Sequence, residues 1–277
     1  MPTSRAGCGL AFATTKLSHD IRGHGEPLLL IHGVGHRWQA WLPVLDPLVR
    51  AGFQTIAIDA PGFGDSPPLE LGRRPTITAL SEAVADFLDE RNIDRAHLVG
   101  NSMGGAIAIE LARAGRARTV TAISPAGLWT AREREFCKAS LRMTFESIRR
   151  FPTALERLTP SALGRTLLAS QLIARPWRVP ADELSADLRA LARSPAFLET
   201  LDAFDDYRMS GFQELRSTPI TIAWGTRDHL LIPRQARRAR RVLTHARHLP
   251  LDGCGHIPMW DAPELVAANI IRGTKMS

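Results

Sequence analysis

Lysine and tyrosine are scarce in this 277-residue chain. Only three of its 35 basic residues are lysines, so the other 32 are arginines, and these are spread along the chain among 28 acidic residues. The net charge of +7 therefore indicates an arginine-rich composition rather than a stripe that binds nucleic acid. The densest basic stretch, RQARRARR at 234–241, is expected to be the solvated face of a helix. We expect no nucleic-acid partner.

Cysteine is also rare, and long apolar runs are missing. Cys8, Cys137 and Cys254 lie far apart without a CxxC pair, which predicts neither a disulfide framework nor a zinc site and favours a reducing, cytoplasmic compartment. No run approaches the roughly 18 consecutive apolar residues that a membrane span needs. The short stretch AGCGLAFA at 6–13 is not interpreted as a signal peptide. We expect a globular cytoplasmic protein without a membrane span.

The chain alternates between short apolar runs and segments of helical period. The runs predicted as strands, each ending in a loop, are PLLLIHG at 27–33, TIAIDAPG at 55–62, AHLVGNS at 96–102, TVTAISPAG at 119–127, ITIAWGTRD at 220–228 and RHLPLDGCGH at 247–256. Segments such as 77–92 and 105–115 repeat apolar residues at three- and four-residue steps, which is typical of helices. The alternation predicts an α/β fold, with a mostly parallel central sheet and helices on both of its faces.

Residues 128–217 interrupt this alternation. Three helix-like segments, at 141–151, 162–177 and 183–194, are separated by prolines, and no strand pattern appears among them. We therefore expect a helical cap at 128–217, inserted into a core that residues 1–127 and 218–277 form together. In such folds, ligands bind beside the loops that leave the carboxyl ends of parallel strands. The cap is expected to border that site.

Ser102 lies where a predicted strand meets a predicted helix, within the pentapeptide Gly100-Asn101-Ser102-Met103-Gly104. This is the G-x-S-x-G pattern in the context that it requires. The glycines have a steric reason, because the sharp turn brings strand and helix too close for side chains at these positions. The turn would present the hydroxyl beside a helix N-terminus, which favours developing negative charge. The pattern predicts a nucleophilic serine.

Four further motifs accompany the serine: HGVG at 32–35, DAPGFGDS at 59–66, WGTRD at 224–228 and GCGH at 253–256. Together, in this order, they resemble the α/β-hydrolase superfamily over nearly the whole chain. The resemblance implies that His256 takes the proton of Ser102, while Asp228 orients His256 and stabilises its imidazolium. It also implies an oxyanion hole made by the backbone N–H groups of Val34 and Met103. Neither a cofactor nor a metal is required.

Other polar residues are interpreted structurally. His32 is expected to order the oxyanion loop by hydrogen bonding, and Asp59 and Asp65 match a structural loop of the superfamily. Cys254 is expected to pack in the interior. Asp252, four residues before His256, remains an alternative as an auxiliary acid.

Residues near the expected pocket carry less specific signals. His36 is expected to pack against the first helix or to line the rim of the pocket. Apolar residues of the cap suit either the pocket wall or the interior of the cap itself. They are Leu128, Trp129, Phe145, Leu168, Leu172 and Trp177.

The identities of single residues also reduce the number of reactions that fit the sequence. The haloalkane dehalogenases and epoxide hydrolases of the superfamily attack with a carboxylate, and epoxide opening usually employs two cap tyrosines, whereas this chain has Ser102 and the single tyrosine Tyr207. The stretch IDRAHLVGNSMGGA at 93–106 resembles the meta-cleavage product hydrolases, which break carbon–carbon bonds in vinylogous diketo acids. Those enzymes usually carry a tryptophan after the histidine, where Ile257 stands here. They also bring a cap arginine to the substrate carboxylate.

Three functions therefore remain. Hydrolysis of a carboxylic ester requires only the triad, the oxyanion hole and an apolar pocket, so we expect a serine hydrolase that acts on a small to medium apolar molecule through an acyl-enzyme on Ser102. The alternative is a carbon–carbon hydrolase, in which Arg175 or Arg178 could bind the carboxylate. A non-catalytic ligand receptor on the same fold is the third, and the intact motifs favour an enzyme. Acyl-chain length, natural substrate and oligomeric state stay open.

Overall fold

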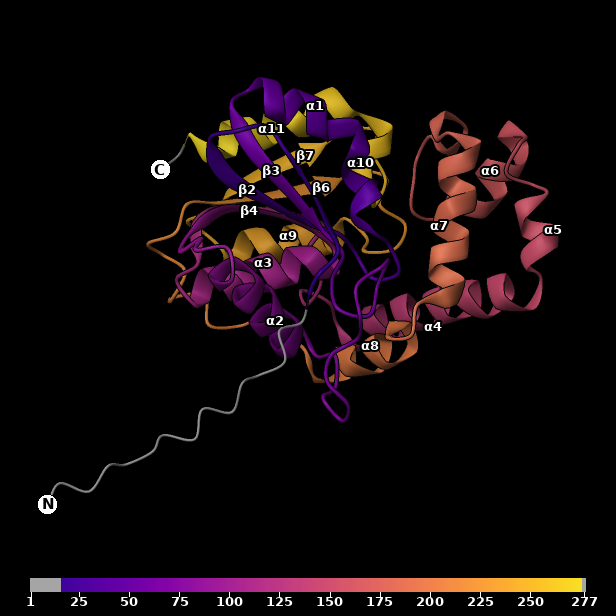
Figure 1. Ribbon diagram of the computed structural model, residues 1–277, viewed down its shortest axis with the longest axis horizontal. Coiled ribbons are helices and arrows are strands. Elements are labelled where there is room, and N and C mark those ends of the chain that lie inside the picture. The colour runs from indigo at the N-terminus through magenta and orange to yellow at the C-terminus, as the bar shows by residue number, and fades with distance from the viewer. Residues whose placement is uncertain (1–15, 276–277) are drawn as a thin grey trace, which may run out of the picture.

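The computed structural model describes residues 16–275 (Figure 1), so Cys8 and the stretch at 6–13 lie outside the described residues. Within this range seven strands form one sheet in the order β1-β3-β2-β4-β5-β6-β7. β1 pairs antiparallel with β3, and every other pair is parallel. The strands are β1 (His19–Arg22), β2 (Glu26–Ile31), β3 (Phe53–Ile58), β4 (Ala96–Asn101), β5 (Ala117–Ile123), β6 (Ile220–Gly225) and β7 (Arg247–Leu251).

Helices cover both faces of the sheet, as predicted. In Figure 1, α1 and α11 lie over one face, and α2, α3 and α9 lie over the other. Successive residues of β2 therefore alternate between two hydrophobic clusters, with Leu28 and Leu30 on the α1 side and Leu29 and Ile31 on the α3 side. These helices are η1 (Trp38–Trp41), α1 (Leu42–Arg50), α2 (Ile77–Asp89), α3 (Met103–Arg113), α9 (Arg234–Val242), α10 (Pro258–Asp261) and α11 (Pro263–Thr274).

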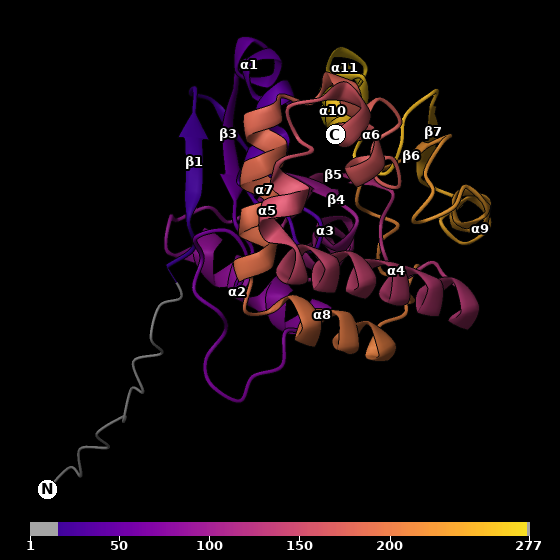
Figure 2. The same ribbon diagram turned by 90° about the vertical axis from the view of Figure 1, so that its right-hand side faces the viewer.

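A helical segment separates β5 from β6. Its elements are α4 (Ala131–Arg150), α5 (Pro152–Glu156), α6 (Ala162–Ala169), η2 (Pro176–Arg178), α7 (Ala181–Arg193), α8 (Phe197–Ala203) and η3 (Phe204–Asp206). Figure 2 shows α4, α6 and α7 in front of β4 and β5. α4 begins ten residues earlier than its predicted segment because Thr130 and Glu133 form a capping box at Ala131.

The prediction of one helical segment at 162–177 is wrong beyond Ala169. α6 ends there, and residues 170–175 form turns and bends before η2. The N–H groups of Ala174 and Arg175 donate to the Asp261 carboxylate instead of continuing a helix. A contact with a residue far along the chain has overridden the local helical period.

Two expectations about the surface can also be compared with the structure. α9 buries Gln235 and Ala239 and leaves Arg237, Arg240 and Arg241 exposed, which confirms a solvated basic helix face. No helix in the described part of the chain is both long and apolar enough to cross a membrane.

Candidate active site

Ser102 occupies a strained turn between β4 and α3. Its backbone has φ 57° and ψ −115°, a positive φ that costs free energy in a residue with a side chain. Two backbone hydrogen bonds hold the turn, from the Ser102 N–H to the Ile123 carbonyl (2.9 Å) and from the Ala126 N–H to the Ser102 carbonyl (3.0 Å). These bonds hold Ser102 in its strained conformation at the carboxyl end of β4.

The glycines of the turn are required for space. A Cβ on Gly100 would lie 2.0 Å from the Gly104 carbonyl oxygen, and a Cβ on Gly104 would lie 2.1 Å from the Ile31 carbonyl oxygen. Both separations are far below van der Waals contact. The steric reason expected for the G-x-S-x-G pattern is confirmed.

Asp228 and His256 come from the loops after β6 and β7 and meet in the interior. His256 Nδ1 lies 2.8 Å from Asp228 Oδ2, and the N–H groups of Leu230 and Leu231 donate to Asp228 Oδ1. The carboxylate therefore accepts the proton on Nδ1, which leaves the Nε2 lone pair of a neutral ring free. Nε2 is buried and has no hydrogen-bond partner among residues 16–275.

A hydrogen bond joins the serine turn to the histidine loop. Asn101 Nδ2 donates to the His256 carbonyl at 2.9 Å and to the Ile123 carbonyl at 3.2 Å. Asn101 is buried, so loss of this amide would leave the His256 carbonyl without its donor, while the Ile123 carbonyl would keep the Ser102 N–H. The neighbour of Ser102 thus fixes the backbone of the residue that carries the imidazole.

The predicted oxyanion loop lies against Ser102. A Cβ on Gly33 would be only 3.2 Å from Ser102 Cβ, so the loop and the serine turn are in close contact. The N–H groups of Val34 and Met103 donate to no acceptor in the described part of the chain. Two free backbone donors beside a serine are what a developing oxyanion needs.

His32 supports this loop from inside the protein. Its Nδ1–H donates to the Gly33 carbonyl at 2.7 Å, and its Nε2 accepts from the Ala60 N–H at 2.9 Å. Burial lowers the pKa of His32 to about 3, so the ring stays neutral and keeps both bonds. The expectation that His32 orders the loop is confirmed.

The remaining acids and the thiol also have structural surroundings. Asp59 accepts hydrogen bonds from the N–H groups of Trp38 (2.6 Å) and Asp65 (2.9 Å), and burial raises the pKa of its carboxyl. Cys254 is fully buried in a hydrophobic cluster, and burial raises the pKa of its thiol to about 11. Both interpretations are confirmed. Asp252 is exposed, and no contact joins it to His256.

Sequence reasoning missed Asp261, which is fully buried. Its Oδ2 accepts from the Gly255 N–H at 2.7 Å, and its Oδ1 accepts from the Arg175 N–H at 2.7 Å. One carboxylate thus connects the loop that carries His256 to the segment between β5 and β6. Asp261 lies in WDAPE, which matches no motif, and its partners in the inserted segment are more than eighty residues away, so no local signal marked it.

A cavity of about 80 Å³ is lined by Val34 of the predicted oxyanion loop and by Ile257, the residue after His256, whereas Ser102, Asp228 and His256 themselves do not line it. Its wall comes from Val34–His36, from the segment between β5 and β6, and from Ile257 and Trp260. Of the apolar cap residues expected near a pocket, Leu168 and Leu172 line it. The other four are not among its lining residues: Trp177 is half exposed, and Leu128, Trp129 and Phe145 are buried in the hydrophobic core. His36 lines the cavity, as one of its two expected positions.

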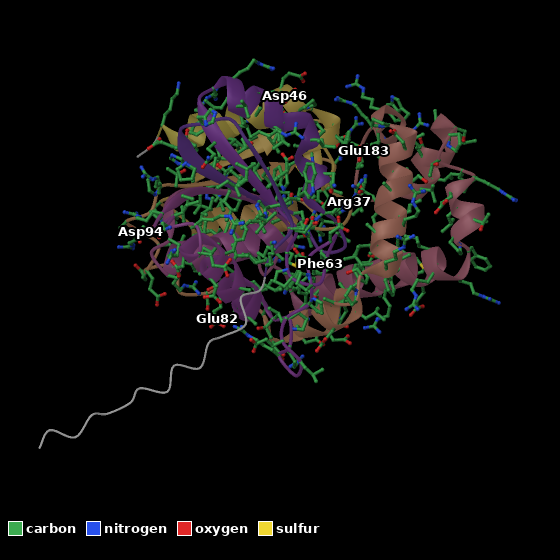
Figure 3. The ribbon with its side chains drawn as sticks, viewed as in Figure 1. Arg37, Asp46, Phe63, Glu82, Asp94 and Glu183 are labelled. Carbon is green, nitrogen blue, oxygen red and sulfur yellow. The ribbon has the colours of Figure 1, made fainter. Side chains whose placement is uncertain are left out.

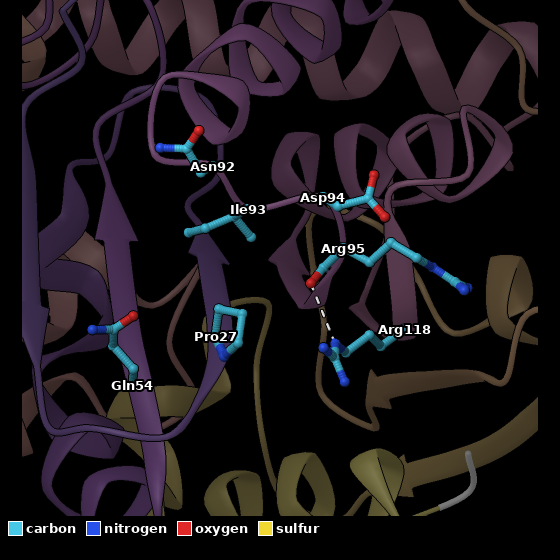
Figure 4. Close-up of a pocket in the computed structure, with 7 residues that line it drawn as sticks. All are labelled: Pro27, Gln54, Asn92, Ile93, Asp94, Arg95 and Arg118. Carbon is cyan, nitrogen blue, oxygen red and sulfur yellow. Dashed lines mark hydrogen bonds between the residues drawn. The ribbon is translucent and has the colours of Figure 1, made fainter.

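A larger hollow of about 610 Å³ lies at the opposite edge of the sheet (Figure 4). It is bounded by the amino-terminal ends of β2, β3 and β5 and by residues 92–95. Arg118 Nε donates there to the Arg95 carbonyl at 3.3 Å. No serine, cysteine or histidine of the described chain lines this hollow, so its lining offers no serine or thiol nucleophile and no imidazole base.

Known proteins resemble this chain over most of its length. Epoxide hydrolase EphH of Mycobacterium tuberculosis is 33% identical over 198 residues, which are 66% of this chain and 88% of that protein. A 2-hydroxy-6-oxo-6-phenylhexa-2,4-dienoate hydrolase of Burkholderia cepacia is 26% identical over 250 residues, 86% of this chain and 84% of that one. The structure of a thermophilic esterase from Thermogutta terrifontis matches with a TM-score of 0.73 and 21% identity, covering 94% of this chain and 93% of the other. A model of the alpha/beta hydrolase family matches residues 28–269, and the chain therefore belongs to that family.

Proposed function

We propose that the protein is a serine hydrolase of carboxylic esters, with Ser102 as nucleophile, His256 as base and Asp228 as the acid that orients it. The observation that carries this proposal is the buried pair of Asp228 and His256, in which His256 Nε2 is left without a partner among the described residues. Asn101 joins the backbone of His256 to the serine turn by a hydrogen bond. An imidazole with a free nitrogen and an orienting acid behind it activate a serine hydroxyl when that hydroxyl comes within hydrogen-bond distance.

The proposed reaction proceeds in two halves. His256 Nε2 takes the proton of Ser102 as its oxygen attacks the ester carbonyl, and the resulting oxyanion accepts hydrogen bonds from the Val34 and Met103 N–H groups. The tetrahedral intermediate collapses as His256 gives its proton to the leaving alcohol. Water then attacks the acyl-enzyme by the same route and releases the carboxylic acid and free Ser102.

The charges around the cavity favour an uncharged ester over an anionic dienoate. No arginine or lysine is among its lining residues in the described chain, whereas the carboxylate of Asp187 is. Arg175 donates from its side chain to the Asp261 carbonyl, and Arg178 is exposed outside the cavity. Neither residue is in place to bind a substrate carboxylate, and Ile257 stands where the carbon–carbon hydrolases usually have tryptophan.

An epoxide hydrolase is among the relatives, but the residues here support a different reaction. The turn carries Ser102 in place of a carboxylate. The hydroxyl of Tyr207 donates to Glu110 on α3 at 2.9 Å, and Tyr207 is not among the residues that line the cavity. The chain therefore supplies neither the carboxylate nor the tyrosine pair that epoxide opening uses.

We further propose that residues 128–217 act as a cap over the core formed by 1–127 and 218–277. Contacts between the two parts support this division, among them the hydrogen bond from the Ile257 N–H to the Leu172 carbonyl at 2.9 Å. The cavity is small and lined mostly by apolar side chains, so the expected substrates carry short acyl groups.

Covalent labelling with a fluorophosphonate and turnover of p-nitrophenyl butanoate test this proposal. Ser102→Ala should abolish labelling and lower kcat by about 10⁴-fold or more, as removal of other triad nucleophiles does. Ser124→Ala is a matched control, because Ser124 is also buried, also has a positive φ (43°) and has a free hydroxyl. Labelling that survives in Ser102→Ala, or disappears in Ser124→Ala, would defeat the assignment.

A further inference from the structure

A second histidine lines the cavity with a carboxylate behind it. His36 follows the oxyanion loop, and Asp187 faces it from α7, with 3.9 Å between His36 Nδ1 and Asp187 Oδ2. Both residues line the cavity, whose other lining residues are mostly apolar. Polar groups at such a wall are the ones that orient a ligand and decide specificity.

Asp187 is held in place by Arg37. Arg37 Nε donates to Asp187 Oδ1 at 2.7 Å, and Arg37 Nη2 donates to Glu183 Oε2 at 2.9 Å. Figure 3 shows Arg37 next to α7, the helix that carries Glu183. The single guanidinium charge is thus shared between two carboxylates. Asp187 Oδ2 accepts no hydrogen bond from the described residues and is left facing His36.

This arrangement determines what His36 presents to the cavity. A carboxylate on the Nδ1 side favours the tautomer with its proton on Nδ1, so Nε2 carries a lone pair. Burial of the imidazole lowers its pKa, and the positive charge of Arg37 lowers it further, whereas the Asp187 carboxylate acts in the opposite direction. The net shift is downward, so the ring stays neutral. Nδ1 is buried and forms no hydrogen bond with the described residues, and the Asp187 carboxylate oxygen lies 3.9 Å from it. Nε2 also forms no hydrogen bond within residues 16–275. It is therefore a free acceptor on the wall of the cavity.

We propose that His36 Nε2 accepts a hydrogen bond from a hydroxyl group on the acyl part of the substrate, so that the enzyme prefers esters of short hydroxy acids. This inference rests on the proposed ester hydrolysis. His36 lies two residues after Val34, so their Cα atoms are at most about 7 Å apart. A hydroxyl two or three bonds from the ester carbonyl matches that separation, as in a 3-hydroxybutanoyl ester.

Paired substrates measure the preference. We expect kcat/KM for p-nitrophenyl 3-hydroxybutanoate to exceed that for p-nitrophenyl butanoate by about three- to tenfold, the effect of one hydrogen bond between neutral groups. His36→Phe should bring this ratio near one. Thr144→Val is the matched control, because it removes another hydroxyl from the same cavity wall and should leave the ratio unchanged. A ratio near one in the unmodified protein, or one that survives His36→Phe, would overturn the proposal.

A binding measurement separates this inference from ester hydrolysis itself. In Ser102→Ala protein with ¹⁵N-labelled histidine, the resonances absent from the His36→Phe spectrum identify His36. We expect the tautomer with its proton on Nδ1, and a shift of the Nε2 resonance with ethyl 3-hydroxybutanoate but not with ethyl butanoate. The opposite tautomer, or equal shifts with both esters, would contradict the inference. Lack of ester turnover in the unmodified protein would defeat the proposed function, while this spectrum would still test His36.

Discussion

Asp228 is close to His256 in space and Asp252 is close to it in the sequence, and the two aspartates differ sharply in their surroundings. Asp228 is buried and accepts from His256 Nδ1, whereas Asp252 lies at the surface. Asp228→Asn should keep the packing but favour the wrong tautomer of His256, and so lower kcat by about 10⁴-fold. Asp252→Asn should change kcat less than threefold. Steady-state kinetics on p-nitrophenyl butanoate compare the two, and a reversed order would assign the acid to Asp252.

Local motifs explain which residues of the site could be predicted. Ser102, Asp228 and His256 each stand in a short pattern at the end of an apolar run, so the chain marks them without knowledge of its fold. His36, Arg37 and Asp187 carry no such pattern, because the hydrogen bond from Arg37 to Asp187 joins residues 150 positions apart. Groups whose roles arise from contacts between the two parts of the chain became visible only in the folded structure.

The junction of β4, α3 and β2 is the tightest contact between elements near Ser102. Gly104→Ala would place a Cβ 2.1 Å from the Ile31 carbonyl oxygen, so α3 would have to move away from β2, at a cost of about 3 kcal/mol or more in the free energy of unfolding. Gly105→Ala, the next residue of the same helix, meets its nearest atom at 3.0 Å. The better helix propensity of alanine offsets much of that strain, and the net change should stay within about 1 kcal/mol.

Urea unfolding of the two variants measures this difference. In Gly104→Ala the movement of α3 away from β2 would displace the first turn of α3 and with it the Met103 N–H. We therefore expect this variant to lose the proposed esterase activity as well. Equal stabilities of the two variants would show that the junction relaxes easily, and the account of the glycine pattern would then fail.

Asp261 connects two other elements, the loop after β7 and the turn before η2. In Asp261→Asn an amide NH₂ would face backbone N–H groups that now donate to a carboxylate oxygen. We expect the free energy of unfolding to fall by about 2–4 kcal/mol. Activity should fall with it because Gly255 directly precedes His256. The exposed Asp252→Asn is the control in thermal unfolding and should change stability by less than about 0.5 kcal/mol.

Strand and helix boundaries show the same limit of sequence reasoning. The six apolar runs became β2 to β7 because each follows a strong local pattern, although β7 is a partly exposed edge strand. β1 was not predicted, since its four residues HDIR form a partly exposed edge strand without an apolar run. Residues 170–175 were predicted as helix from their period. Their backbone instead follows the hydrogen bonds to Asp261.

At the scale of the whole molecule, the two edges of the sheet differ in what they can bind. The hollow at the amino-terminal edge is larger and carries Arg95 and Arg118 (Figure 4). The cavity at the carboxyl-terminal edge is smaller and mostly apolar, with Asp187 as its one carboxylate among the described lining residues. Val34, which follows Gly33 at the serine turn, and Ile257, which follows His256, line the second cavity, so a substrate of the proposed reaction must tolerate a neighbouring negative charge.

The negative charge of Asp187 distinguishes ester hydrolysis from carbon–carbon bond hydrolysis. A ring-fission dienoate such as 2-hydroxy-6-oxo-6-phenylhexa-2,4-dienoate would bring its carboxylate close to Asp187, which shares the single charge of Arg37 with Glu183. The described lining of the cavity supplies no cation of its own, and juxtaposed like charges cost binding energy. An uncharged ester meets no such cost. We therefore expect kcat/KM for p-nitrophenyl butanoate to exceed that for the dienoate by about a hundredfold or more. The direct comparison of both substrates, with Ser102→Ala as the blank, decides the matter. A preference of tenfold or more for the dienoate would replace the esterase with a carbon–carbon hydrolase, while Ser102, Asp228 and His256 would keep their roles.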